Sequence, residues 1–190
     1  MTALDLQLEQ LATLINGLSR RSQAAFFLSF SKAYTESANW RLRDDGEMRN
    51  LLLLAQDAAY AFCLGDVSAE RANALKSLDI TLPSEMLAQS AWICADVALR
   101  VSVDATFESG MSVEYALEPF LGRVSEDLFG YWQVGSGDNE AAQVAEVMAH
   151  PVVLEGVAFC RWAIGVLASS AAPSAGLIEQ VTARVAVPSR

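Results

Sequence analysis

Apolar residues surround the segment from Ser84 to Thr106 on every side of a helix, not along one stripe. A helix that is apolar all round lies in the middle of a protein. The segment is long enough to cross a bilayer, but charged residues are rare in a lipid-facing span. Four occur here: Glu85, Asp96, Arg100 and Asp104. The pattern therefore predicts the central helix of a soluble bundle, over about residues 84–106, with Ser84 as its N-cap and with Trp92 and Arg100 largely buried.

Apolar residues at spacings of three and four fill most of the remaining chain. Pro119 should kink or break one of these segments, and His150 with Pro151 should end another. Gly156 and Gly165 should allow close helix packing. The helices expected beside the central one span about residues 2–18, 22–38, 47–65, 68–78, 113–132, 140–149, 152–170 and 177–185. No strand pattern or repeat interrupts them, so we expect an all-α bundle of about eight helices.

The length of 190 residues fits one domain, 1–190, and a hydrophobic content of 53% supplies a large core. Residues 171–190 form a linker and a short amphipathic helix, which we expect to dock loosely. Three cysteines are an odd number without short spacing, which argues against a disulfide framework or a zinc site. The three are Cys63, Cys94 and Cys160. Buried free thiols and the lack of a signal-peptide pattern indicate a cytoplasmic protein.

The net charge of −10 sets the kind of partner that we expect. Nucleic-acid binding needs a basic surface, and an anionic membrane attracts basic segments, so both partners are disfavoured. An acidic surface favours solubility or a basic protein partner. The sequence does not indicate an oligomeric state.

The central helix carries one polar ridge, formed by Asp96, Arg100 and Asp104. Spacings of four place all three on one helix face, with the arginine between the two acids. They form either an intrahelical ion network or part of a carboxylate-rich ligand pocket. A metal site would need further ligands from other helices, which the sequence does not indicate, so no metal is expected.

Negative charge is concentrated between Asp104 and Glu155. This stretch contains ten acidic residues and one basic residue, Arg123, which gives it a local charge of −9. Aromatic residues lie among the acids, and interfaces use Tyr and Trp as anchors while charge steers the encounter. The alternative is a solvated acidic face. The candidate partner-binding residues are Glu114, Glu118, Glu126, Asp127, Tyr131, Trp132, Asp138 and Glu140.

Catalytic motifs do not appear in the sequence. His150 is the one histidine, and no nucleophile elbow, phosphate-binding loop or dinucleotide fingerprint accompanies it. We place His150 at a helix C-terminus, stabilised by the helix dipole. No catalytic residue and no cofactor is therefore predicted.

Three segments carry a resemblance to known proteins: SQAAFFLSFSKAY, LLLLAQDAAYAFCLG after the polar loop with Asp45, and SAWICADVALRVSVDA. The chain resembles the small all-helical bacterial proteins of the YjaG-like family of unknown function. It also resembles the helical immunity proteins of bacterial polymorphic toxin systems. The resemblance covers about residues 8–107 and rests on an aromatic-rich helix, a charged loop and alanine-rich helices. It implies an all-α fold and a role in binding and neutralising a toxin.

Two functions follow as hypotheses. The first is a non-enzymatic immunity protein that inhibits a cognate toxin with a basic surface through protein–protein interaction. The second is a small-ligand-binding or catalytic bundle that uses Asp96, Arg100 and Asp104 in an interior pocket.

Overall fold

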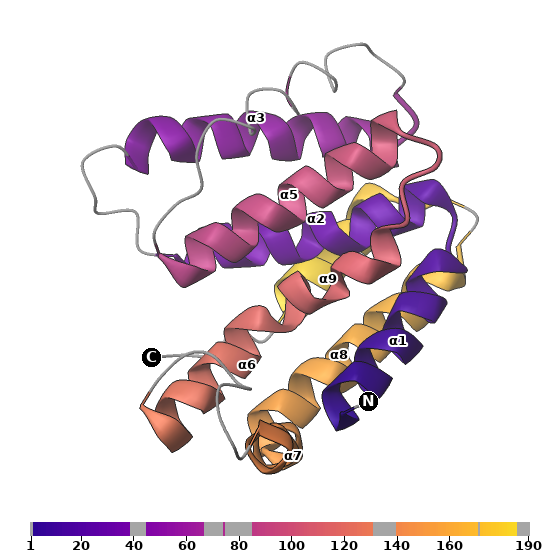
Figure 1. The fold of residues 1–190 in the computed structure, drawn as a ribbon. Helices are drawn as coiled ribbons and strands as arrows, with labels where there is room; N and C mark the ends of the chain where they lie inside the picture. Colours follow the sequence, from indigo (N-terminus) through magenta and orange to yellow (C-terminus); the bar gives the residue numbers. More distant parts are fainter. Residues whose placement is uncertain are drawn as a thin grey trace.

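The computed structural model describes residues 2–38, 45–66, 74, 85–130, 140–170 and 172–185. Within these ranges the chain is helical and contains no strand, which confirms the predicted all-α single-domain bundle (Figure 1). The elements are α1 (Ala3–Asn16), α2 (Arg20–Ser37), α3 (Asp45–Cys63), α5 (Met86–Val103), the 3-10 turn η1 (Ser109–Ser112), α6 (Val113–Phe129), α7 (Glu140–Ala149), α8 (Pro151–Ala168) and α9 (Ala175–Arg184).

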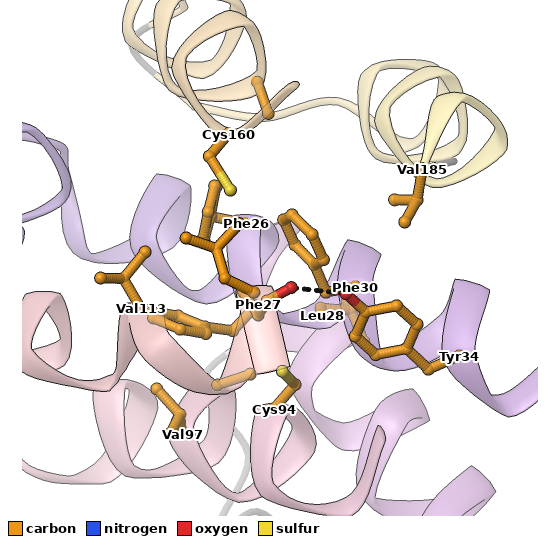
Figure 2. Packing of buried hydrophobic residues seen from close by; sticks show 14 of the residues in the cluster. Phe26, Phe27, Leu28, Phe30, Tyr34, Cys94, Val97, Val113, Cys160 and Val185 are labelled. Carbon is orange, nitrogen blue, oxygen red and sulfur yellow. Dashed lines mark hydrogen bonds between the residues drawn. The ribbon is translucent and has the colours of Figure 1, made fainter. Parts of the chain in front are cut away.

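The core is built around a pair of helices rather than one central helix. The predicted segment 84–106 forms α5, and its Trp92 is buried as expected. Its most extensive contacts are with α2, which also packs against α3, α8 and α9 (Figure 1). Figure 2 shows the aromatic residues of α2 between α5, which carries Cys94 and Val97, and α8, which carries Cys160. Phe26, Phe27, Phe30 and Tyr34 are all fully buried there.

Polar side chains join α2, α3 and α5 inside this core. Ser31 donates from Oγ to the carbonyl of Ala91 at 2.7 Å. Gln56 of α3 donates from Nε2 to the hydroxyl oxygens of Ser31 and Thr35, each at 2.8 Å. Buried polar groups are costly unless they find partners. These bonds therefore fix how the three helices lie against one another.

The helix ends agree with the sequence at some positions and differ at others. Thr2 caps α1 in a reciprocal capping box with Asp5. Gly65 ends α3 with φ of 106°: its N–H donates to Phe62, and the N–H of residue 66 donates to the carbonyl of residue 61. This pair of bonds is a Schellman motif, in which glycine avoids the strain of a left-handed backbone.

Three expected helix boundaries need correction, in whole or in part. Glu85 rather than Ser84 caps α5, because its carboxylate accepts from the N–H of Ala88 at 2.8 Å. Pro119 lies inside α6, which continues through it to Phe129, so of the two expected alternatives the break is wrong. α7 ends at Ala149, directly before His150, as expected, but His150 also caps the next helix, α8: its Nδ1 accepts from the N–H of residue 152 at 3.3 Å.

The two glycines of α8 have different environments. A Cβ on Gly156 would lie 2.9 Å from Cγ of Phe120, so this glycine lets α8 approach α6. A Cβ on Gly165 would meet nothing within 4 Å, so the expected close packing is wrong at this position.

Two helices, α5 and α8, are long and apolar enough to cross a membrane by length and composition. Within the fold, 61% of the α5 window and 44% of the α8 window is buried. Both therefore contribute to the protein core. The last helix, α9, docks on α2 through Ile178 and Val181, which are both fully buried.

Candidate protein-binding surface

The polar ridge of α5 does not form an interior pocket. Asp96 and Arg100 pair at 2.6 Å, but their side chains keep 22% and 41% of their exposure. Asp104 is exposed and ends the helix. The expectation that Arg100 is largely buried is therefore wrong, because the ridge faces outward. Of the expected three-residue network, the structure shows the ion pair between Asp96 and Arg100, whereas Asp104 bonds to Thr106.

Asp104 contributes to the turn that follows α5. Its Oδ1 accepts from the N–H and the hydroxyl of Thr106, at 2.8 and 2.7 Å. These hydrogen bonds lower the pKa of Asp104 below its ordinary value, since they stabilise the carboxylate. This carboxylate has a local structural role in the turn.

The acidic residues of α6 point in different directions. Glu114, Glu126 and Asp127 are exposed, and Asp127 pairs with Arg123 at 3.0 Å. Glu118 is half-buried between α6 and α5, where its carboxylate accepts from Ser90 Oγ at 3.3 Å. The predicted face is thus divided along the helix instead of forming one patch.

Desolvation raises the pKa of Glu118, and the charge of Glu114 adds to the shift. The hydrogen bond from Ser90 opposes it. Burial disfavours the carboxylate form because it removes water from the charge. Glu118 is consequently a poorer contact for a partner than the exposed acids of the same helix.

Other members of the predicted face are only partly placed. Tyr131, Trp132 and Asp138 lie outside the described residues, and Glu140 is placed only as the first residue of α7. Among the aromatic residues of this stretch, Phe120 belongs to the core.

A groove beside Glu114 brings further carboxylates to the same place. It lies between α1, η1 and the start of α6 and has a volume of about 480 Å³. Its acidic residues are Asp5, Glu9 and Glu114, and none of the residues lining it is basic. Its apolar lining comes from Leu8, Ala12, Met111 and Val113.

Gly110 determines how closely the two walls of this acidic groove approach. Its N–H donates to Oδ1 of Asn16 at 2.9 Å. A Cβ at this position would collide with the carbonyl oxygen of Ala12 and with the side chain of Asn16. Only glycine therefore lets η1 lie this close to α1. Beside it, Met111 is 72% exposed.

Sequence reasoning missed Asp5 and Glu9. They precede Glu114 by more than a hundred residues, and only the packing of α1 on η1 and α6 unites the three. Their spacing of four did place them on one helix face, which was the available signal. This spacing did not indicate that η1 and the start of α6 would form the other side of the groove.

Metal-ligating and thiol side chains are the other reactive groups in the part of the chain that is described. No group of three His, Cys, Asp or Glu side chains there is arranged to hold a metal ion. Cys63, Cys94 and Cys160 are buried free thiols. Burial raises the pKa of Cys63 to about 12 and raises those of the other two thiols further, so none is an activated nucleophile.

No protein-family model, curated protein or solved structure matches the chain.

Proposed function

We propose that this protein is a non-enzymatic binding protein that recognises a basic protein partner. The observation that carries the proposal is the acidic groove, where Asp5, Glu9 and Glu114 converge from two helices without a basic residue among its lining. Interfaces arrange charge so that a negative patch meets a positive one. The groove therefore favours a partner that presents lysine or arginine side chains.

Exposed apolar area in the same groove supports protein recognition over simple ion binding. Met111 is highly exposed beside the carboxylates, and methionine adapts its shape to irregular partner surfaces. An apolar centre with a charged rim is the usual anatomy of a protein interface. The carboxylates would then orient the partner while Met111 is buried by it.

The partner that we propose is a cognate bacterial toxin, which the protein neutralises as an immunity protein in the cytoplasm. The excess of negative charge between residues 104 and 155 supports this partner, because many toxins that attack nucleic acids are basic. An acidic inhibitor of such a toxin would imitate the charge of its substrate. Glu126 is a further exposed acid of α6, while Asp127 is paired with Arg123.

The test begins with capture of the partner from the native host and measurement of its association rate at low and physiological salt. Charge reversal by Glu9→Lys with Glu114→Lys should slow association several-fold, and the difference should shrink as salt screens the charges. Met111→Ala should mainly speed dissociation. Glu47→Lys, at an exposed position of α3, is the matched control.

Two results would overturn the proposal. One is a partner that binds the double charge-reversal variant as fast and as tightly as it binds the wild type. The other is a captured partner with an acidic contact surface. The tested positions are exposed, so thermal melts should show that the variants remain folded.

A further inference from the structure

A second groove lies on the other side of α1, and its lining is almost entirely apolar. It runs between α1, α7 and α8, and its volume is about 500 Å³. In Figure 1, α1 and α8 run alongside each other and α7 is seen end-on at their lower end. This volume is in the range of pockets that hold small molecules, about 300–1,000 Å³. The apolar lining consists of Ala3, Leu6, Ala145, Met148, Ala149, Leu154, Val157 and Ala158.

This apolar groove has one charged residue, at one end. Leu154, Ala158 and Arg161 follow one face of α8 at spacings of four and three. The helical rise places Arg161 about 10 Å from Leu154 along the axis. The groove is therefore apolar along its length and cationic at one end.

Neutral side chains hold the guanidinium of Arg161. Its Nη2 donates to Oε1 of Gln7 at 2.9 Å and to Oε1 of Gln10 at 3.0 Å, both on α1. Among the described residues no carboxylate lies within ion-pair distance of it. In a chain with 23 acids and 13 bases, an arginine held by two glutamines instead of a carboxylate is a notable arrangement. Its remaining N–H groups suit the planar oxygens of a carboxylate.

We propose that this groove binds a free medium-chain fatty acid such as dodecanoic acid, with the aliphatic chain on the apolar lining and the carboxylate on Arg161. The side chains of Leu6 and Leu154, which are 42% and 53% exposed, would cover the chain. Burial of this area supplies the affinity, and the single cation sets the orientation. The proposal does not depend on the protein partner proposed above, because no residue lines both grooves.

The test is calorimetric titration of the full chain with dodecanoic acid below its micelle concentration, together with thermal melts. Specific binding should raise the melting temperature, because the ligand stabilises the native state. Arg161→Gln should weaken binding about tenfold or more, since a charge-assisted bond is lost. Ala158→Trp should fill the groove and abolish binding. Arg49→Gln, on an exposed face of α3, is the matched control and should bind normally.

Control ligands distinguish binding of a free fatty acid from binding of other molecules that carry an acyl or alkyl chain. Dodecanol and dodecylamine should bind more weakly than the acid, because neither offers a carboxylate to Arg161. The proposal is overturned if the acid does not bind or lowers the melting temperature as a detergent would. It is equally overturned if Arg161→Gln and Ala158→Trp both bind like wild type, or if phosphatidylglycerol vesicles bind and the free acid does not.

Discussion

The guanidinium of Arg20, the first residue of α2, donates from Nη1 to the backbone carbonyl of Phe107 at 2.6 Å. Its Nη2 donates to the carbonyl of Val101 at 2.8 Å and also to that of Asp104. The last carbonyls of a helix lack partners within the helix and carry partial negative charge. One arginine thus satisfies the end of α5 and holds the turn that leads to the acidic groove.

Replacing Arg20 should therefore destabilise the fold. Arg20→Ala removes charge-assisted hydrogen bonds, each of which contributes about 1.5–3 kcal/mol, and we expect a loss of about 2–3 kcal/mol in urea unfolding. Arg49→Ala is the control, because an exposed substitution on α3 should change stability by less than about 0.5 kcal/mol. Equal losses in the two variants would contradict the role assigned to Arg20.

The two glycines of α8 should respond in opposite directions to the same substitution. Gly156→Ala places a methyl group 2.9 Å from a ring carbon of Phe120, so we expect a loss of about 1–3 kcal/mol. Gly165→Ala meets open space and should stabilise the helix by about 0.5–1 kcal/mol. Each variant is the control for the other in urea melts. Stabilisation by both would mean that α6 and α8 lie further apart.

The ion pair on α5 should contribute little to stability. Arg100 keeps 41% of its side-chain exposure, so water screens its attraction to Asp96. Exposed pairs are typically worth under about 1 kcal/mol, and we expect Arg100→Ala to stay below that value in urea unfolding. A loss of about 3–5 kcal/mol would instead mean that the substitution strands a buried charge.

Glu118 should make stability depend on pH. The pKa of Glu118 is raised in the folded state, chiefly by desolvation. The protonated side chain is therefore favoured by folding, and the stability that it contributes is fully present below the unfolded pKa of about 4.3. That contribution is lost as the pH rises through the higher folded pKa. Glu118→Gln should consequently gain stability relative to wild type between about pH 4 and pH 7.

Urea melts of both proteins across this pH range check the expectation for Glu118. Glu126→Gln removes one negative charge from an exposed position of the same helix, so it controls for the change in net charge. A stability difference between Glu118→Gln and wild type that does not vary with pH would contradict the burial of this carboxylate.

The cysteines should be unreactive in the native protein. Cys63, Cys94 and Cys160 are all fully buried, and burial raises the pKa of each thiol. A thiol reagent at mildly alkaline pH should label none of them before unfolding and three per chain in denaturant. Rapid labelling of one cysteine in the native state would show local opening around it.

Within the described residues the sequence predicted the helices well, because helical periodicity is a local property; the helix expected over residues 68–78 lies outside them except for residue 74. Residues 140–149 and the helix after Ser112 begin where expected, and the burial of Trp92 follows from the apolar surroundings of α5. The exposure of Arg100 could not be predicted in the same way. A helix face is read from sequence, but whether that face meets another helix depends on tertiary packing.

The candidate site was predicted only in part, for a related reason. Glu114 was identified because acidic residues cluster around it in the sequence, whereas its neighbours in the groove come from the other end of the chain. Arg161 gave no sequence signal, because its role depends on Gln7 and Gln10 more than 150 residues earlier.

The contact between Asn16 and Gly110 spans 94 residues of sequence, and α1 also packs against α7 and α8. During synthesis at about 5–20 residues per second, the first helix must therefore wait roughly 5–20 s before η1 is even made. Throughout that interval its apolar face, with Leu11 and Ile15, has none of these partners. The nascent chain should thus present an early, long-lived binding segment to ribosome-associated chaperones.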